Sequence, residues 1–278
     1  MTEYVFDFYS TDGTQLSIVD WNIDNPKGVI AFLHGHGEHK MRYKHVAEFF
    51  SSKGFASMAF DLRGHGISKG KKGHTPSMEQ WLDDVEHFLM QVRSKHTEIP
   101  IILYGHSMGG NIGLNYLLKR RIDDIACAII TSALLKIAFE PPKWKVTLGK
   151  AMSNLWPSLA QPTGLNPEHI STDKEEVSKY KNDPLVHGLM SARMFVEIFD
   201  TAEWVLQNAN KLKTPTLLLH GTADQINSVE GSKIFAEKSG DLSESKFWDG
   251  KYHELQNETN REEVFQYELD WITTQLGF

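Results

Sequence analysis

Residues 99–111 read IPIILYGHSMGGN, and this stretch decides the fold of the chain. Ile101–Tyr104 form a short apolar, partly β-branched run that suits a buried central strand. The next five residues, Gly105–Gly109, fit the G-x-S-x-G pattern of a nucleophile elbow, which holds a serine on a strained strand-to-helix turn. Glycine on both sides keeps bulk away from that turn. Ser107 is therefore the candidate nucleophile.

The five-residue pattern also arises by chance in glycine-bearing loops, so its context matters. A strand pattern precedes it, and apolar residues at helical spacing follow it from Ile112 to Leu118. The amide groups at the start of such a helix point at the serine oxygen. This context favours a catalytic elbow over a chance match.

Composition excludes several classes of protein. The chain has 278 residues, 40% of them hydrophobic and 23% charged, which is typical of a globular protein. Its formal net charge of −7 argues against nucleic acid as a partner. The single cysteine, Cys127, lies in an apolar run and is expected to be a buried apolar residue in a reducing compartment.

The N-terminal residues, MTEYVFDFYS, lack the basic and apolar regions of a signal peptide. The longest mostly apolar stretch, Ile125–Phe139, is interrupted by polar residues and is shorter than the ~20 residues that span a bilayer. We therefore expect a cytoplasmic protein, with peripheral contact to a membrane surface left open.

Strand and helix patterns alternate over most of the chain. The strands are predicted at residues 4–8 and 16–21 (a ribbon around Asp12-Gly13), 28–33, 55–60, 101–104, 125–131 and 214–220, and a last strand is predicted to begin at 246–248. The helices are predicted at residues 43–50, 78–92, 202–212, 229–238 and 261–276. This alternation predicts a mostly parallel central sheet with helices on both faces.

The alternation breaks between residues 132 and 200, a proline-rich segment with no convincing parallel strand. We predict short helices there, forming a helical cap inserted after the sixth strand, with residues 1–131 and 201–278 as the core. A lid over the site is favoured over a decoration without function, because long excursions in compact domains are usually functional. Within it, residues 143–156 place apolar side chains on one helical face (Trp144, Leu148, Ala151, Met152 and Leu155). Packing on its own domain is the simpler interpretation of that face. The alternative is that part of the face lines the acyl pocket or rests on a lipid surface.

A serine nucleophile needs a base, and the base needs an orienting carboxylate. Where a nucleophile elbow carries the serine, the Asp or Glu follows it along the chain and the His comes last. Asp224 lies in the loop after the strand at 214–220, at the edge where sites form in open α/β sheets. It competes with an interpretation as a helix cap, while Asp183 and Asp200 are weaker candidates because neither follows a strand. His253 is the one histidine after Asp224, so the chain order selects it as the base.

An oxyanion hole requires two backbone N–H donors. The amide of Met108, directly after the nucleophile, is one candidate, and the amide of His36, in the glycine-rich turn after the strand at 28–33, is the other. The histidines of this turn (His34, His36 and His39) also suggest a metal site, which we disfavour because no downstream partner has a metal-ligand spacing.

Taken together, these segments resemble one family. The chain resembles the α/β-hydrolases grouped around monoacylglycerol lipase and bacterial lysophospholipases, also called serine aminopeptidase-like hydrolases. The likeness is carried by His34–His39 with Arg42-Tyr43, Asp61–Gly66 with Ser68, Gly105–Gly110, Asn182–Val186 with Ser191–Arg193, and Tyr252–Glu254. It implies an α/β-hydrolase fold, a cap, no cofactor, lipid-like ester substrates, and oxyanion donors at His36 and Met108. The chain departs from the family at His36, where a small residue is usual.

We therefore expect a serine carboxylester hydrolase of the monoacylglycerol lipase type, with Ser107, Asp224 and His253 as its catalytic residues and no metal. The same residues would also serve a lysophospholipase, a thioesterase or a peptidase. A non-catalytic binding protein that retained the fold is an alternative from another class, which the intact triad argues against. The acyl chain length, the physiological substrate and the oligomeric state are left open by the sequence.

Overall fold

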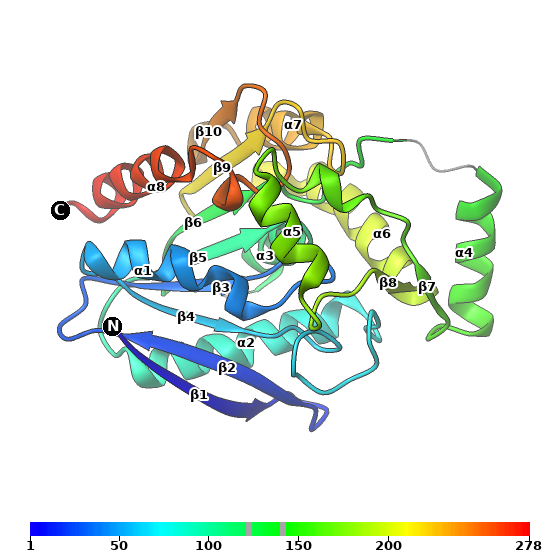
Figure 1. The fold of residues 1–278 in the computed structure, drawn as a ribbon, viewed down its shortest axis with the longest axis horizontal. Coiled ribbons are helices and arrows are strands. Elements are labelled where there is room, and N and C mark those ends of the chain that lie inside the picture. Colours follow the sequence, from blue (N-terminus) through cyan, green and yellow to red (C-terminus); the bar gives the residue numbers. More distant parts are fainter. Residues whose placement is uncertain (121–123, 140–142) are drawn as a thin grey trace.

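The computed structural model describes residues 1–120, 124–139 and 143–278. Its main element is an eight-stranded sheet with the order β1-β2-β4-β3-β5-β6-β9-β10 (Figure 1). The strands are β1 (Thr2–Tyr9), β2 (Gln15–Asn22), β3 (Val29–Leu33), β4 (Ala56–Phe60), β5 (Ile101–His106), β6 (Ile125–Thr131), β9 (Thr216–Gly221) and β10 (Ser243–Trp248). β1 and β2 form the predicted antiparallel ribbon at one edge, and the pairs from β4 to β10 are parallel. The predicted α/β-hydrolase fold is confirmed.

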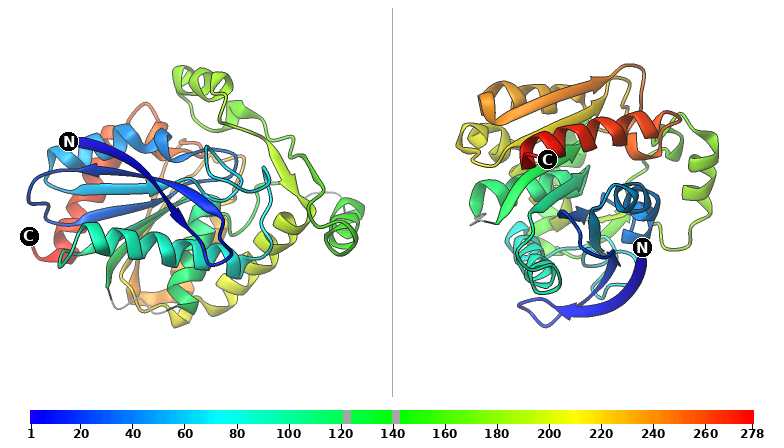
Figure 2. Two further views of the ribbon diagram at one scale, coloured as in Figure 1. Left: turned by 90° about the horizontal axis from the view of Figure 1, so that it is seen from below. Right: turned by 90° about the vertical axis from the view of Figure 1, so that its left-hand side faces the viewer.

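Helices cover both faces of the sheet (Figure 2). One layer contains α1 (Lys44–Ser52) and α8 (Arg261–Leu276), and the other contains α2 (Met78–Lys95), α3 (Met108–Lys119), α6 (Ala192–Asn208) and α7 (Val229–Ser239). Strand β3 explains why the sequence shows a continuous apolar run. Its consecutive residues Ala31 and Phe32 point to opposite faces of the sheet and belong to two separate hydrophobic cores, so side chains on both faces are buried.

Several element boundaries differ from the prediction. The last strand runs from Ser243 to Trp248, so it begins earlier than predicted. Its start was missed because half of this edge strand is exposed and its polar residues hide the apolar pattern. Helix α6 begins ten residues earlier than predicted, where the Ser191 side chain caps it by accepting from the Met194 amide. The short antiparallel pair of β7 (Ala160–Pro162) and β8 (Leu189–Ser191) was not predicted, since three-residue strands carry too little periodicity to be recognised.

The segment between β6 and α6, residues 132–191, is called the insertion below. It contains α4 (Lys143–Leu155), β7, the short helix Pro167–His169, α5 (Lys174–Asn182) and β8. Helix α6 continues from the insertion onto α3 of the core. The predicted domain boundary after residue 200 therefore lies inside one helix, and the division into core and cap stays a proposal.

The second half of the insertion is held to the core by polar side chains. His39 pairs with Asp183 at 2.8 Å between Nε2 and Oδ2. The Arg42 guanidinium lies 4.8 Å from the ring centre of Tyr180 on α5, and Arg261 pairs with Glu176 at 3.0 Å. These contacts place α5 over the carboxyl ends of the strands (Figure 1).

Helix α4 is attached differently, because it stands away from the sheet and packs against α6 (Figures 1 and 2). A Cβ atom at Gly149 would lie 3.5 Å from the Phe195 ring of α6, which shows the side that faces the partner helix. The apolar face predicted from the sequence is turned outward instead: Trp144 and Leu148 are exposed, and Leu155 is 81% exposed. Helix α4 does pack on α6, as the simpler interpretation expects, but most of this apolar face stays exposed and only Met152 of its named residues is half-buried.

Among the helices of the described chain, none combines the length and the apolar character that crossing a bilayer requires.

One buried carboxyl makes stability depend on pH. Glu268 of α8 is fully buried, its Oε1 accepts from the Tyr104 hydroxyl at 3.0 Å, and its Oε2 finds no partner among the described residues. Burial, only partly offset by this hydrogen bond, raises the pKa of Glu268 from 4.5 to about 8. The folded state thus keeps a proton that the unfolded chain loses, and stability is lost as the pH rises toward 8.

Glu268→Gln removes this titration. Its free energy of unfolding should rise relative to that of the wild type by at least ~2 kcal/mol between pH 5 and pH 8, because one pKa unit corresponds to ~1.4 kcal/mol. Urea unfolding of both proteins at several pH values measures the difference. The same substitution at exposed Glu262 is the control, and a difference for Glu268→Gln that stays constant across this range would contradict the prediction.

Candidate active site

The elbow lies where β5 meets α3, and its geometry explains the two glycines. Ser107 has φ 54° and ψ −115°, a backbone conformation that residues with a side chain rarely adopt. A Cβ atom at Gly105 would lie 2.7 Å from the Gly109 carbonyl oxygen, and one at Gly109 would lie 2.1 Å from the carbonyl oxygen of Leu33. Any side chain at either position would therefore force the turn open.

Three predicted residues lie in one hydrogen-bonded line. The Ser107 Oγ is 3.0 Å from Nε2 of His253, and Nδ1 of the same ring is 2.7 Å from Oδ2 of Asp224. The carboxylate fixes the tautomer, because it accepts the hydrogen on Nδ1 and leaves Nε2 free to accept from the serine hydroxyl. All three side chains are buried. They follow β5, β9 and β10, so the carboxyl ends of parallel strands bring them together.

Neighbouring charges shift the pKa values of Asp224 and His253. Burial alone would raise the pKa of Asp224, but the charge of His253 and hydrogen bonds from two imidazoles hold that pKa well below its usual range. Burial would lower the pKa of His253, yet its raised value shows that the Asp224 carboxylate, aided by Glu254 and Glu38, outweighs it. The carboxylate therefore stays ionised and favours the imidazolium that forms when serine gives up its proton.

The alternatives for the acid lie elsewhere. Asp183 is paired with His39 at the edge of the pocket, and Asp200 lies on the surface of α6, 3.9 Å from Lys150. Helix α7 is capped by the Ser228 side chain rather than by Asp224. Asp224 Oδ1 instead accepts from the amides of Ile226 and Asn227, which leaves Oδ2 for the histidine.

The two predicted oxyanion donors flank Ser107 in the fold. Met108 is the first residue of α3, and His36 lies in the loop after β3 and, like Ser107, lines the pocket. A buried carboxylate holds this loop, since Glu38 Oε1 accepts from the Gly35 amide at 2.6 Å. Its other oxygen accepts from Arg42, whose guanidinium also binds both carboxylate oxygens of Glu254 at 2.7 and 2.8 Å. The loops of His36 and His253 are thereby tied together.

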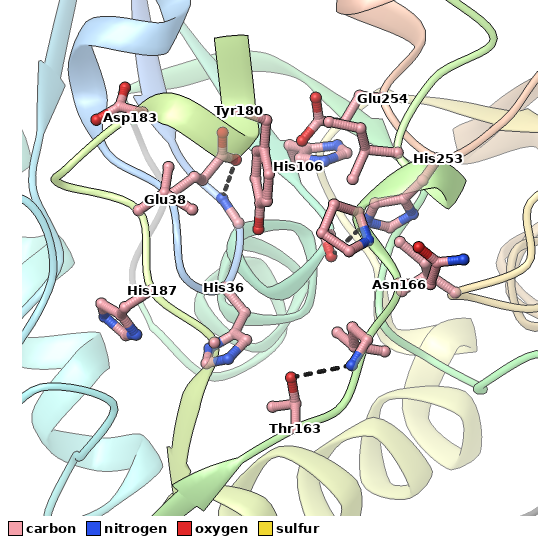
Figure 3. A pocket seen from close by; sticks show the side chains of 18 of the residues that line it. His36, Glu38, His106, Thr163, Asn166, Tyr180, Asp183, His187, His253 and Glu254 are labelled. Atoms are coloured by element: carbon pink, nitrogen blue, oxygen red, sulfur yellow. Dashed lines mark hydrogen bonds between the residues drawn. The ribbon is translucent and has the colours of Figure 1, made fainter. Parts of the chain in front are cut away.

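The pocket in front of Ser107 has a volume of about 300 Å³. Its apolar lining is Leu134, Leu165, Pro167, Ile170, Val186, Met190 and Ile226. Polar side chains line the pocket as well, among them Glu38, Asn166, Tyr180 and His187 (Figure 3). The insertion supplies residues to both parts, so it forms one wall of the site.

The ring of His36 narrows the pocket. It lies with its centre 5.8 Å from that of His65 and 5.9 Å from that of His187, and neither of its nitrogens has a hydrogen-bond partner in the described part of the chain. Burial, together with the neighbouring His187 and His34, lowers the pKa of His36 to about 3. The ring is therefore neutral at physiological pH.

Two of the three histidines of this turn, His34 and His39, have separate hydrogen-bond partners. His34 donates from Nδ1 to the Gly35 carbonyl and accepts the Leu62 amide at Nε2, while His39 pairs with Asp183. Within the described residues, no group of three His, Cys, Asp or Glu side chains is arranged to hold a metal ion.

Sequence reasoning missed several side chains at the site. Glu38, Arg42 and Glu254 were recognised only as parts of motifs, and nothing in their spacing shows that they pair. Asn227 was not singled out at all, although its Nδ2 donates to the Ser132 carbonyl at 2.8 Å and lies 3.4 Å from the Ser107 Oγ. His220, which contacts Asp224, was noted only as the end of a strand. These side chains are recognised as part of the site only from their contacts in the folded chain.

Comparisons with known proteins identify relatives of this chain. A Dictyostelium discoideum protein described as an uncharacterized abhydrolase domain-containing protein is 35% identical over 99% of this chain, which spans only 30% of that longer protein. The monoacylglycerol lipase of Mycolicibacterium smegmatis is 29% identical over 97% of this chain and 96% of its own length.

A soluble variant of the Saccharomyces cerevisiae monoglyceride lipase, solved with a substrate analogue, is 25% identical and superposes with a TM-score of 0.87 over 98% of this chain and 94% of its own. The family described as serine aminopeptidase, S33, matches residues 24–260, a range that includes Ser107, Asp224 and His253. The chain therefore belongs to the serine aminopeptidase, S33, family of α/β-hydrolases.

Proposed function

We propose that this enzyme releases a fatty acid from a monoacylglycerol, using Ser107, His253 and Asp224 as its catalytic triad. The chain is an ester-hydrolysing enzyme related to monoacylglycerol lipases. The observation that carries the residue assignment is the unbroken hydrogen-bonded line from the Ser107 hydroxyl through His253 to Asp224, which opens into a pocket with an apolar wall.

The chemistry follows from this line. The Ser107 Oγ attacks the ester carbonyl while Nε2 of His253 takes its proton, and the Asp224 carboxylate stabilises the imidazolium. The amides of His36 and Met108 donate to the oxygen that becomes negative. His253 then gives its proton to the departing alcohol, and a water molecule activated by the same ring releases the fatty acid from the serine.

The pocket favours a neutral, hydroxyl-bearing head group. The cations at and near it are already engaged: Lys181 of its lining is paired with Glu168, and Arg42, behind the lining residues Glu38 and Glu254, is held by both of them. A phosphate would find these groups occupied, whereas the carboxylates beside them accept hydrogen bonds from hydroxyls. Glycerol therefore fits this site better than the phosphorylated head group of a lysophospholipid, and a comparison of their esters separates the two activities.

The outward face of α4 gives the insertion a second role in this proposal. Trp144, Leu148 and Leu155 expose a contiguous apolar face at helical spacing, next to the exposed ring of Trp156. A monoacylglycerol resides in a membrane or micelle, so a face that partitions into lipid would bring the pocket to its substrate. We propose that α4 makes this transient contact while α5 stays anchored on the core.

The triad assignment predicts the effect of three substitutions. Ser107→Ala, His253→Ala and Asp224→Asn should each lower kcat by roughly 10⁴-fold on p-nitrophenyl butyrate, and combining them should add little, since the residues act as a unit. A fluorophosphonate probe should label the wild type at Ser107 and spare Ser107→Ala. Melting temperatures measured alongside exclude loss of the fold. Wild-type activity in Asp224→Asn together with an inactive Asp200→Asn would contradict the assignment of the acid.

The α4 proposal predicts an effect that depends on the substrate. Leu148→Asp and Leu155→Asp should lower hydrolysis of a long-chain monoacylglycerol in vesicles roughly tenfold, because a charge opposes entry into lipid. They should leave hydrolysis of soluble p-nitrophenyl butyrate and the melting temperature unchanged. Asn154→Asp is the matched control, since it adds the same charge to an exposed polar position of α4. Equal losses on both substrates would instead show that this face supports the fold.

A further inference from the structure

The carboxylate of Asp224 is shared by two imidazole rings. Oδ2 lies 2.7 Å from Nδ1 of His253 and 3.1 Å from Nε2 of His220, while Oδ1 accepts from the amides of Ile226 and Asn227. Only the first of these four donors belongs to the proposed triad. The second imidazole, that of His220, therefore has no role in the triad chemistry proposed above.

His220 is held on both sides of its ring. It lies fully buried on β9, and its Nε2 faces two acceptors, Oδ2 of Asp224 and the Asn227 carbonyl oxygen at 3.2 Å. Because both are acceptors, Nε2 carries its hydrogen, and Nδ1 is left to accept from the Ser232 hydroxyl of α7 at 2.8 Å. The ring is thus fixed between the strand, the acid loop and the next helix.

This arrangement also reaches the nucleophile. The main-chain carbonyl of Asn227 accepts from His220. The side-chain Nδ2 of Asn227 donates to the Ser132 carbonyl at 2.8 Å and lies 3.4 Å from the Ser107 Oγ. His220 therefore holds both the oxygen that orients His253 and the residue that lies against the serine.

We propose that His220 is a positioning residue of the triad, which fixes the Asp224 carboxylate and the acid loop through its Nε2–H group. The proposal rests on the proposed function, since it assigns a partner to the triad acid. His220 would not touch the substrate and would act through Asp224.

The proposal has an electrostatic consequence for His253. The carboxylate is faced by His220 and His253, and His253 is faced by Asp224, Glu254, Glu38 and the His106 ring, whose centre is 4.9 Å away. Each hydrogen bond to the carboxylate disperses its negative charge. Loss of the His220 donor leaves more charge facing His253, favours its imidazolium form and keeps the base protonated to a higher pH.

The test is the pH profile of kcat/KM on p-nitrophenyl butyrate. His220→Leu removes the donor and retains bulk, whereas His220→Gln keeps an amide that reaches the Nε2 position. Leu218→Ala is the matched control, because Leu218 is equally buried on the same strand and does not contact Asp224. We expect His220→Leu to lower kcat/KM roughly tenfold at pH 8 and at least threefold further at pH 6, and His220→Gln to restore most of both losses.

If His220→Leu does not fold, His220→Asn replaces it in the test. The shorter amide of asparagine reaches Ser232 but not Asp224, so this variant should show the same pH dependence of kcat/KM. Losses in His220→Leu or His220→Asn that are equal at both pH values and match Leu218→Ala would overturn the proposal. Asp224→Asn, measured in parallel, separates the two hypotheses. If it is as active as the wild type, the triad assignment fails; if it is inactive while the His220 variants show no pH dependence, the triad stands and His220 is structural.

Discussion

The site depends on one close backbone approach, between Gly109 at the start of α3 and the carbonyl of Leu33 at the end of β3. A side chain at Gly109 would overlap that carbonyl, and one at Gly105 would overlap Gly109 itself. With both absent, Ser107 is held at a positive φ where β5 meets α3, and it lines the pocket. The same contact fixes where the β3 loop, with His36, lies relative to the nucleophile.

Buried charges extend this constraint to the rest of the site. Glu38 binds the Gly35 amide and the Tyr43 hydroxyl, and Arg42 links it to Glu254, the neighbour of the proposed base His253. Removing one partner from such a network strands a buried charge, which is strongly destabilising. The network therefore keeps two loops from opposite ends of the chain in one arrangement, and it does so without contributing a group to the proposed chemistry.

The sequence predicted what depends on local pattern. The alternating strands and helices, the elbow, and the positions of Asp224 and His253 after strands all follow from periodicity and chain order. The edge strand β10 was misplaced because exposed polar residues mask it, and the start of α6 was missed because its cap lies in an irregular segment. The roles of Asn227, His220 and the Glu38–Arg42 pair depend on side chains that meet only in the folded chain, and no one-dimensional spacing encodes them.

The insertion contacts the loop that contains His36, so the wall of the pocket and the proposed oxyanion donor depend on each other. The His187 amide donates to the Gly37 carbonyl at 2.9 Å, and a Cβ atom at Gly37 would lie 2.1 Å from the His187 carbonyl oxygen. The backbone of the insertion therefore docks against the residue that follows His36. Since the His36 ring also packs against His187, a movement of this part of the insertion would change both the width of the pocket and the support of the proposed oxyanion donor. Helix α4 lies beyond this contact and packs on α6, so the lipid contact proposed for α4 does not require a movement of the wall formed by His187.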